Sequence, residues 1–287
     1  MNFSDKLREA TEKNNSLLCV GLDVDLNLAP RCILAESDPI FAFNKAIIDA
    51  TIDLVCAYKP NIAFYEALGV MGMQALHKIA NYVPRHIPVI LDAKLGDVGH
   101  TANAYAQAIF GVWGFDAVTL NPYLGSDSIV PFLQYTHKAV FILTRTSNPG
   151  SADFQDLICD GKPLYQRVVQ KAREWSGTGN CGLVVGGTRP ETIREIRSIA
   201  PNMIFLVPGI GAQGGDIRAT VQHGSTAEGI GPIISSSRSI IYSSQGKDFA
   251  EAARKAAEQL RKSINACRRG SPTPEDSSAD LEGDDGP

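Results

Sequence analysis

Short apolar segments alternate with longer segments of helical period along most of the chain. The short segments are typical of parallel strands buried on both faces, and the longer ones of amphipathic helices. The predicted strands are 17–23, 56–61, a stretch from Val89, 117–122, 139–146, 182–185, 204–208 and 229–234, and the predicted helices are 40–54, 64–82, 102–112, 161–175, 191–199 and 249–265. Eight strands without an internal linker favour a single α/β domain, a (β/α)8 TIM barrel, over an open doubly wound sheet. The 287 residues suffice for it, because such barrels typically use about 250.

Polar residues recur where these predicted strands end. They are Asp23, Lys59, Asn61, Asp92, Lys94, Asn121, Thr144 and Ser147. In a parallel barrel the C-terminal ends of all strands meet at one mouth, where active sites are built. The repeated polar strand ends therefore predict a functional site at that mouth.

The third predicted strand carries the densest group of charges. Asp92 and Lys94 are two residues apart, so their side chains point to the same side of a strand. Asp97 follows just past the strand end, where Gly96 and Gly99 indicate a turn. Charges at the end of a buried strand reduce stability unless they are paired. The cluster is either catalytic or a structural ion pair, and the other polar strand ends favour catalysis.

Two late loops predict a phosphate site. Residues 208–216 form a glycine-rich loop after the seventh strand, and the segment 235–239 follows the eighth. Barrels often bind phosphate between these loops through backbone N–H groups. Gln213 can donate its amide, and Arg238 can form a bidentate pair with phosphate oxygens. The Gly-x-Gly-x-x-Gly pattern at 209–214 would indicate a dinucleotide site only after a first strand, so we reject that reading.

Composition excludes several classes of function. Six of the 31 acidic residues lie in 271–287, and the other 25 nearly balance 27 basic residues, so no nucleic-acid partner is expected. We expect 1–268 to form the barrel domain and 269–287 a disordered acidic tail. No signal peptide is recognisable, and no apolar run reaches the ~18 residues of a membrane helix. Cysteines and histidines lack metal-ligand spacing, so we expect a reduced, cytoplasmic protein without metal.

Five short motifs occur in a characteristic order along the chain. They are Val20-Gly-Leu-Asp23, Lys59-Pro-Asn-x-Ala-Phe-Tyr-Glu66, Asp92-x-Lys94-x-x-Asp97, Thr146-Ser-Asn-Pro-Gly150 and Pro208-Gly-Ile-Gly-Ala-Gln-Gly-Gly215. Each motif is weak alone. Together they resemble orotidine 5′-monophosphate decarboxylases, in the longer bacterial branch of that family, over about residues 17–242.

The resemblance implies decarboxylation of orotidine 5′-monophosphate to uridine 5′-monophosphate and CO2, the last step of de novo pyrimidine nucleotide synthesis, without metal or organic cofactor. Lys94 resembles the proton donor to C6 of the pyrimidine. Asp92 would lie beside the departing carboxylate, and Lys59 would pair with Asp92. Asp97 and Thr101 resemble residues that enter the neighbouring subunit's site, which implies a homodimer.

The same resemblance supplies the substrate-binding set. Its members are Asp23 for the ribose, Ser147 for the pyrimidine, Gln213, Ser237 and Arg238 for the phosphate, and Asn61. Two positions depart from shorter relatives, which have glycine where Ser237 stands and a serine on the pyrimidine where this chain has Gly186 and Gly187. A backbone N–H of Ser237 can still serve, provided that its φ is allowed.

Three alternative functions remain. Ketogulonate-phosphate decarboxylase and hexulose-phosphate synthase share the Asp-x-Lys-x-x-Asp skeleton but hold Mg²⁺ with a Glu on the preceding strand, where this chain has the cation Lys59. A nucleotide-binding sensor without activity would have no use for the strained acidic and basic cluster. A purely structural Asp92–Lys94 pair would predict that removing Lys94 unfolds the protein.

Overall fold

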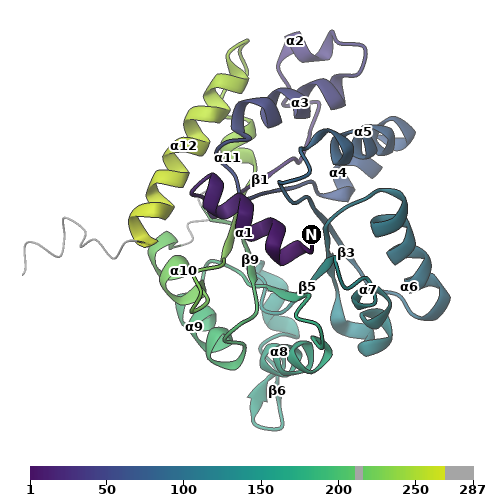
Figure 1. The fold of residues 1–287 in the computed structure, drawn as a ribbon, viewed down its shortest axis with the longest axis vertical. Helices are drawn as coiled ribbons and strands as arrows, with labels where there is room; N and C mark the ends of the chain where they lie inside the picture. Colours follow the sequence, from purple (N-terminus) through teal and green to yellow (C-terminus); the bar gives the residue numbers. More distant parts are fainter. Residues whose placement is uncertain (211–215, 269–287) are drawn as a thin grey trace, which may run out of the picture.

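The computed structural model describes residues 1–210 and 216–268. Gln213 and the predicted acidic tail lie outside the described residues. In Figure 1 a ring of strands stands at the centre and helices surround it. This is the arrangement of a parallel α/β barrel.

Eight parallel strands form the barrel. They are β1 Leu18–Gly21, β2 Ala57–Lys59, β3 Ile90–Leu95, β4 Ala117–Leu120, β5 Ala139–Leu143, β8 Cys181–Val184, β9 Phe205–Pro208 and β10 Ile233–Ser236. Their order in the sheet is β2-β1-β10-β9-β8-β5-β4-β3, so that neighbours follow the chain around the ring. The bridges Tyr58↔Val89 and Asn61↔Asp92 join β2 to β3 and close it. The predicted (β/α)8 barrel is confirmed.

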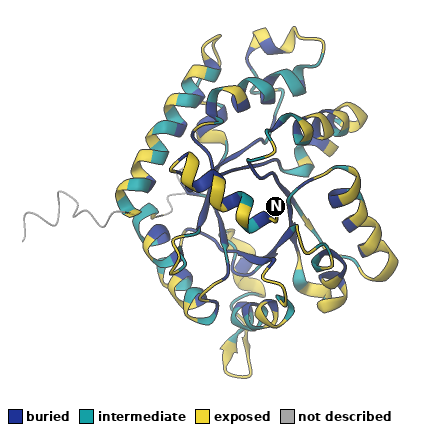
Figure 2. Cartoon of the chain, viewed as in Figure 1, coloured by how far each residue is buried: buried dark blue, intermediate teal, exposed yellow. Residues whose placement is uncertain are grey.

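Helices cover the outside of the barrel. The longer ones are α3 Pro39–Thr51, α5 Gly69–Tyr82, α6 Gly99–Ala106 with its π-helical continuation Gln107–Val112, α8 Leu164–Trp175, α9 Pro190–Ile199, α10 Ile217–Gly224 and α12 Phe249–Arg268. The short ones are α2 Arg31–Leu34, α4 Ile62–Glu66, α7 Val130–Leu133 and α11 Arg238–Ile241. Figure 2 shows buried residues on the strands and exposed residues on the outer helix faces, as expected for amphipathic helices on a barrel.

Helix α1 Phe3–Lys13 precedes the first strand and was not predicted, and neither were α2, α7, α10 and α11. Helix α1 crosses the centre of the ring in Figure 1. The Phe3 N–H donates to the His137 carbonyl, just before β5, at 3.0 Å. Buried Phe3 and Leu7 join the apolar residues that fill the barrel interior, and the Phe3 ring meets that of Phe141 edge-on at 5.7 Å. Helix α1 therefore closes the N-terminal end of the barrel with apolar side chains.

Several predicted boundaries differ from the structure, and three of these differences have a clear local cause or consequence. The helix predicted at 64–82 is two helices, α4 and α5, because Gly69, the first residue of α5, adopts φ +62° and interrupts the helix. The strand predicted at 229–234 is β10, shifted toward the carboxyl end, so Ser235 and Ser236 lie in a strand. The helix predicted from 161 begins at Leu164, after a hairpin of β6 Ile158–Cys159 and β7 Lys162–Pro163.

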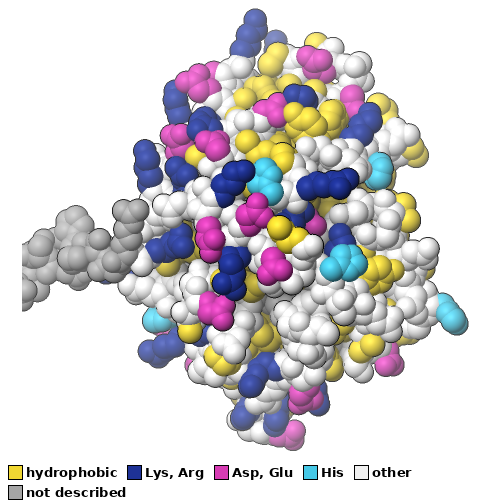
Figure 3. All heavy atoms as spheres, in the orientation of Figure 1, with side chains coloured by type: hydrophobic (Ala, Val, Ile, Leu, Met, Phe, Trp, Pro, Cys, Tyr) yellow, Lys and Arg dark blue, Asp and Glu magenta, His cyan; other side chains and the backbone are white. Residues whose placement is uncertain are grey.

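Charge is mixed on the surface that surrounds α1. Figure 3 shows basic and acidic side chains interspersed over this face. None of the helices within 1–210 and 216–268 is long and apolar enough to cross a membrane.

Candidate active site

Lys59, Asp92 and Lys94 meet at the C-terminal ends of β2 and β3. Lys59 Nζ lies 2.9 Å from Asp92 Oδ2, and Lys94 Nζ lies 2.6 Å from Asp92 Oδ1. Lys59 and Asp92 are buried, whereas 46% of the Lys94 side chain is exposed. One carboxylate is therefore shared by two ammonium groups, and the second of them borders an open cavity. The predicted proximity of Asp92 and Lys94 is confirmed.

The ionisation of this group of charges follows from its geometry. Burial alone would raise the pKa of the Asp92 carboxyl, but the ammonium groups of Lys59 and Lys94 outweigh burial and hold that pKa well below its usual range. Burial alone would lower the pKa of Lys59, but the charges of Asp92 and then Asp23 raise it. The buried pair is therefore ionised at neutral pH.

A break in β3 directs Lys94 toward the cavity. Strand β3 pairs with β4 at Leu91↔Val118 and again at Leu95↔Leu120, with a shift in register between them. Three residues of β3 therefore lie opposite one residue of β4, which is the pattern of a β-bulge. Within the bulge Lys94 adopts φ +48°, a left-handed conformation that residues other than glycine rarely take.

Thr119 is the β4 residue opposite this bulge, and it was not predicted. Its Oγ1 lies 2.9 Å from Asp92 Oδ1, and the backbone N–H groups of Ala93 and Lys94 donate to it at 3.0 and 2.9 Å. A threonine within an apolar strand is ordinary, because β-branched residues favour strands. Only the register of β3 against β4 reveals its contacts.

Asp23 and Asn61 lie beside the group of charges at the ends of β1 and β2. The backbone N–H of Asn61 donates to Asp23 Oδ1 at 3.2 Å. The Asn61 side chain caps α4, because its Oδ1 accepts from the Ala63 N–H at 3.1 Å. Asn61 thus has a structural role that its position at a strand end did not predict.

Asp97 and Thr101 belong to the segment that leads from β3 into α6. The Asp97 carboxylate accepts a hydrogen bond from the Val98 N–H at 2.8 Å and forms no ion pair with any described residue. Asp97 is half-buried, and Thr101 is exposed on α6. Neither is among the residues that line the cavity beside Lys94.

A cavity of about 360 Å³ opens above the charges. Lys59, Asp92 and Lys94 line it together with Thr119, Leu143, Thr146, Ser147, Asn148, Gln155, Val184, Leu206 and Pro208. One wall is thus charged, and the side chains from β5, β8 and β9 make an apolar floor. A flat, polar ring can lie on the floor with one edge against the charged wall.

The loop after β10 approaches β1 closely. Ser237 precedes α11, and a Cβ at Gly21 would collide with the Ser237 hydroxyl and lie 3.3 Å from an Asp23 carboxylate oxygen. Glycine at position 21 is therefore needed for the two strand ends to meet. Arg238 is exposed at the start of α11. Gln213 belongs to the undescribed segment 211–215, so no contact between it and Arg238 can be assigned.

A buried arginine anchors the segment 149–157, which follows β5. Arg145 Nε and Nη2 donate to the two oxygens of Asp156 at 2.7 and 2.9 Å, and Nη1 donates to the Ser151 hydroxyl. Gln155 accepts from the Thr146 N–H at 2.8 Å. These bonds tie this segment to the end of β5, where Thr146 and Ser147 line the cavity.

The Gly186–Gly187 segment is glycine for a steric reason. A Cβ at Gly186 would lie 2.8 Å from the Ser147 backbone nitrogen, and one at Gly187 would collide with the side chain of Ile210. The end of β8 therefore approaches the Ser147 loop too closely for a side chain at position 186.

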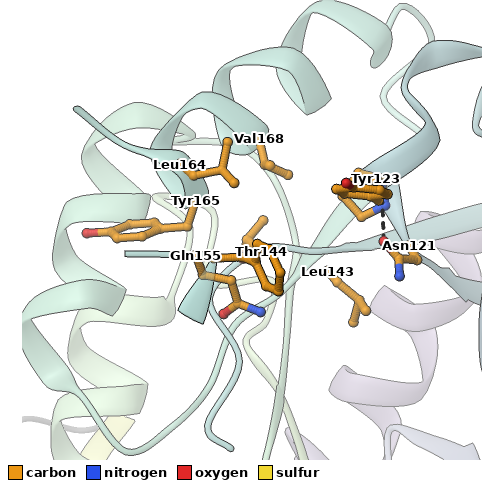
Figure 4. Close-up of a pocket in the computed structure, with 10 residues that line it drawn as sticks. Asn121, Tyr123, Leu143, Thr144, Gln155, Leu164, Tyr165 and Val168 are labelled. Carbon is orange, nitrogen blue, oxygen red and sulfur yellow. Dashed lines mark hydrogen bonds between the residues drawn. The ribbon is translucent and has the colours of Figure 1, made fainter. Parts of the chain in front are cut away.

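A second cavity of about 700 Å³ adjoins the first, outside β4 and β5. Leu143 and Gln155 line both cavities. Figure 4 shows Leu164 and Val168 of α8 on one side of it and Tyr123, whose N–H donates to Asn121 Oδ1, on the other. Its walls are mostly apolar, and the charged side chains of the first cavity are absent from its lining.

The side chains at the mouth do not suit a divalent cation. No cluster of three or more His, Cys, Asp or Glu side chains that could hold a metal occurs in the part of the chain that the structure describes. Asp92, the buried acid of the site, already has an ammonium group on each oxygen. Mg²⁺ would need oxygen ligands where these cations stand.

Comparison with known proteins identifies the family. The family model described as "Orotidine 5′-phosphate decarboxylase / HUMPS family" matches residues 16–256. The chain belongs to this family. It is 54% identical over 273 residues, 93% of this chain and 100% of the other, to a protein of Cellvibrio japonicus named orotidine 5′-phosphate decarboxylase.

Solved structures of the family agree with the fold. The structure of Leishmania donovani OMP decarboxylase aligns with a TM-score of 0.82 at 41% identity and covers 94% of this chain and 100% of that one. The structure of Leishmania donovani UMP synthase aligns with a TM-score of 0.84 at 41% identity. That alignment covers 95% of this chain but 58% of the synthase, so the chain corresponds to part of that longer protein.

Proposed function

We propose that the protein decarboxylates orotidine 5′-monophosphate to uridine 5′-monophosphate and CO2, with Lys94 as the proton donor to C6. Family membership and the 54% identity to a protein named for this activity support the reaction. The observation that carries the assignment of Lys94 is its ammonium group, held 2.6 Å from Asp92 at the edge of the cavity.

The chemistry requires a fixed positive charge beside the reacting carbon. When the bond from C6 to the carboxylate breaks, its electron pair stays on C6, and CO2 leaves. An ammonium group beside C6 stabilises this developing charge and then transfers a proton to it. Asp92 holds the Lys94 ammonium group in place through their ion pair, and it faces the substrate carboxylate, which disfavours the bound ground state. Lys59 in turn holds Asp92 in place.

The remaining contacts follow the shape of the nucleotide. Ser147 binds the pyrimidine from the cavity wall, and Asp23 with Asn61 binds the ribose near the ends of β1 and β2. Gln213, the Ser237 backbone and Arg238 bind the phosphate. Binding energy from this distant group orders the surrounding loops and excludes water from C6.

The active unit is a homodimer in which Asp97 and Thr101 enter the neighbouring site. Two observations support this: Thr101 is exposed, and Asp97 pairs with no basic side chain of the described residues. Val98 and Tyr105, with 44% and 40% exposed, supply apolar surface beside them. An acid from the partner would give Lys94 a second carboxylate.

Mixing two inactive variants tests the shared site. Lys94→Ala and Asp97→Ala are each expected to be inactive, whereas subunits exchanged between them should regain about a quarter of wild-type activity, because one site of each mixed dimer is intact. Mixtures that stay inactive after exchange, verified by mass spectrometry of the dimer, would contradict the shared site.

The reaction proceeds without metal or cofactor in a cytoplasmic enzyme. All six cysteines are free thiols, as expected for a reducing compartment. The test is the loss of the orotidine ultraviolet chromophore with purified protein in excess EDTA. Turnover at the untreated rate is expected. Activity on this substrate that the chelator abolishes would favour a Mg²⁺-dependent relative, and no turnover at all would contradict the proposed function.

A further inference from the structure

Thr119 is buried against the break in β3. Only 1% of its surface is exposed, and its hydroxyl lies within hydrogen-bond distance of Asp92, Ala93 and Lys94. These are the three consecutive residues of the bulge. The contacts therefore involve both charged side chains of β3 or the backbone that carries them.

The direction of each bond is fixed by the donors. A backbone N–H can only donate, so Thr119 Oγ1 accepts from Ala93 and Lys94, at 3.0 and 2.9 Å. A hydroxyl has one proton and two lone pairs, and that proton is left for Asp92 Oδ1 at 2.9 Å. The full hydrogen-bonding capacity of the hydroxyl is used within the bulge.

These bonds replace what the strand loses. A bulge leaves backbone groups without a partner on the neighbouring strand, and a buried N–H without a partner is destabilising. Here two consecutive N–H groups converge on the Thr119 oxygen instead of a strand carbonyl. The same oxygen thereby holds the Lys94 backbone at φ +48°, the conformation from which the ammonium group reaches Asp92 at 2.6 Å.

We infer that Thr119 is a positioning residue for the decarboxylation: its hydroxyl fixes Asp92 and the Lys94 backbone so that Nζ stands beside the reacting carbon. This inference rests on the proposed function. Thr119 acts through Asp92 and Lys94 and transfers no proton itself. Loss of the Thr119 hydroxyl should therefore slow the chemical step and leave binding of the substrate phosphate unchanged.

The test compares an isosteric variant with a conservative one. Thr119→Val keeps the shape and removes the hydroxyl, and we expect kcat to fall about 10- to 100-fold because small displacements of catalytic groups have effects of this size. KM should stay within about threefold, since uniform binding is retained. Thr119→Ser restores a hydroxyl and should bring kcat back to within about threefold of wild type.

A matched control separates positioning from general destabilisation. Thr51 in α3 is fully buried, and its hydroxyl donates to the Ile47 carbonyl at 2.7 Å. The same hydroxyl lies 2.9 Å from that of Tyr58, and neither residue lines the cavity beside Lys94. Thr51→Val therefore removes a buried, bonded hydroxyl outside the site, so it should lower the melting temperature with kcat unchanged. Should Thr119→Val not fold, Thr119→Ala is measured with the same expectation.

Each outcome decides between the two proposals. Thr119→Val with wild-type kcat per folded molecule, or Thr119→Ser as impaired as Thr119→Val, would overturn the inference while wild-type turnover still supports the proposed function. A wild-type protein without turnover would overturn the proposed function itself. A rise in KM at constant kcat would also overturn the inference, because it would place Thr119 in substrate binding.

Discussion

The two ends of the barrel are equally buried but are held together by different forces. At the N-terminal end Leu7, fully buried, packs α1 into the interior through apolar contacts, to which α1 adds one ion pair of Lys6 with Asp116 at 2.6 Å. At the C-terminal end Lys59, 4% exposed, is buried against the carboxylate of Asp92. Apolar packing is favourable for each group that is buried, whereas a buried ion pair offsets a desolvation penalty of several kcal/mol per ion. The mouth therefore carries charges that folding alone does not require.

This difference predicts a division of effects. Substitutions at the mouth should change activity more than stability, and substitutions under α1 should do the opposite. The largest difference between the effect on activity and the effect on stability is expected for Lys94, because it lies at the mouth and its side chain is 46% exposed.

Lys94→Ala should have the largest effect. We expect kcat/KM to fall by at least about 10⁴-fold, because the variant lacks both the proposed proton donor and the proposed charge beside C6. Stability should change by less than about 1 kcal/mol, since the lost partner is half exposed and Asp92 keeps Lys59 and Thr119. Turnover of orotidine 5′-monophosphate measures the activity, and urea unfolding measures the stability. Unfolding of the variant with residual activity in the folded fraction would instead indicate a structural ion pair.

Lys59→Met should reduce both activity and stability. It leaves the buried Asp92 with one half-exposed cation, and breaking a buried pair typically destabilises by about 3–5 kcal/mol. The double variant Lys59→Met/Asp92→Leu makes the mouth resemble the apolar end. It should regain most of the lost stability and none of the activity. A double variant no more stable than Lys59→Met would show that the buried charges stabilise the fold as well as the reaction.

Leu7→Ala should reverse the pattern. Removing a fully buried leucine from under α1 leaves a cavity and should lower the free energy of unfolding by about 3 kcal/mol. The kcat of the folded enzyme at 25 °C should match wild type. Leu34→Ala, at a leucine that is 48% exposed, is the control for the side chain itself. A marked loss of kcat in Leu7→Ala would mean that the two ends are coupled.

The same contrast explains how much could be predicted from sequence. Alternating segments predicted the barrel, and the polar strand ends predicted the meeting of Lys59, Asp92 and Lys94, because strand direction alone places them at one mouth. Helix α1 was missed, since nothing in residues 3–13 marks a segment that plugs a barrel. Thr119 was missed because its role depends on the register between β3 and β4. The apolar pattern of one strand does not show how that strand is aligned with its neighbour. The division of the predicted helix 64–82 into α4 and α5 was missed because it depends on the positive φ of Gly69, which the sequence pattern does not give.

The smallest expected effect is a difference between the two ends of the barrel in how their contributions to stability depend on pH. The folded protein lowers the pKa of Asp92, so its contribution to stability is present above the unfolded value of about 3.9 and is lost as pH falls below it. The raised pKa of Lys59 makes its contribution complete below about 10.4 and lost only at higher pH. Between pH 5 and 9 both contributions are therefore constant.

Lowering the pH from 5 to 3 should consequently lower the free energy of unfolding of wild type by about 1 kcal/mol relative to Lys59→Met/Asp92→Leu. The reason is that Asp92 becomes protonated over this range in the unfolded chain but stays ionised in the folded protein. The deficit of Leu7→Ala should stay the same over that range, since no group that titrates there is removed. Urea unfolding at pH 3, 4 and 5 measures both differences. If the wild-type and double-variant curves remained parallel down to pH 3, the ammonium groups would not be what keeps Asp92 ionised, and the electrostatic account of the mouth would fail while the packing account of α1 stood.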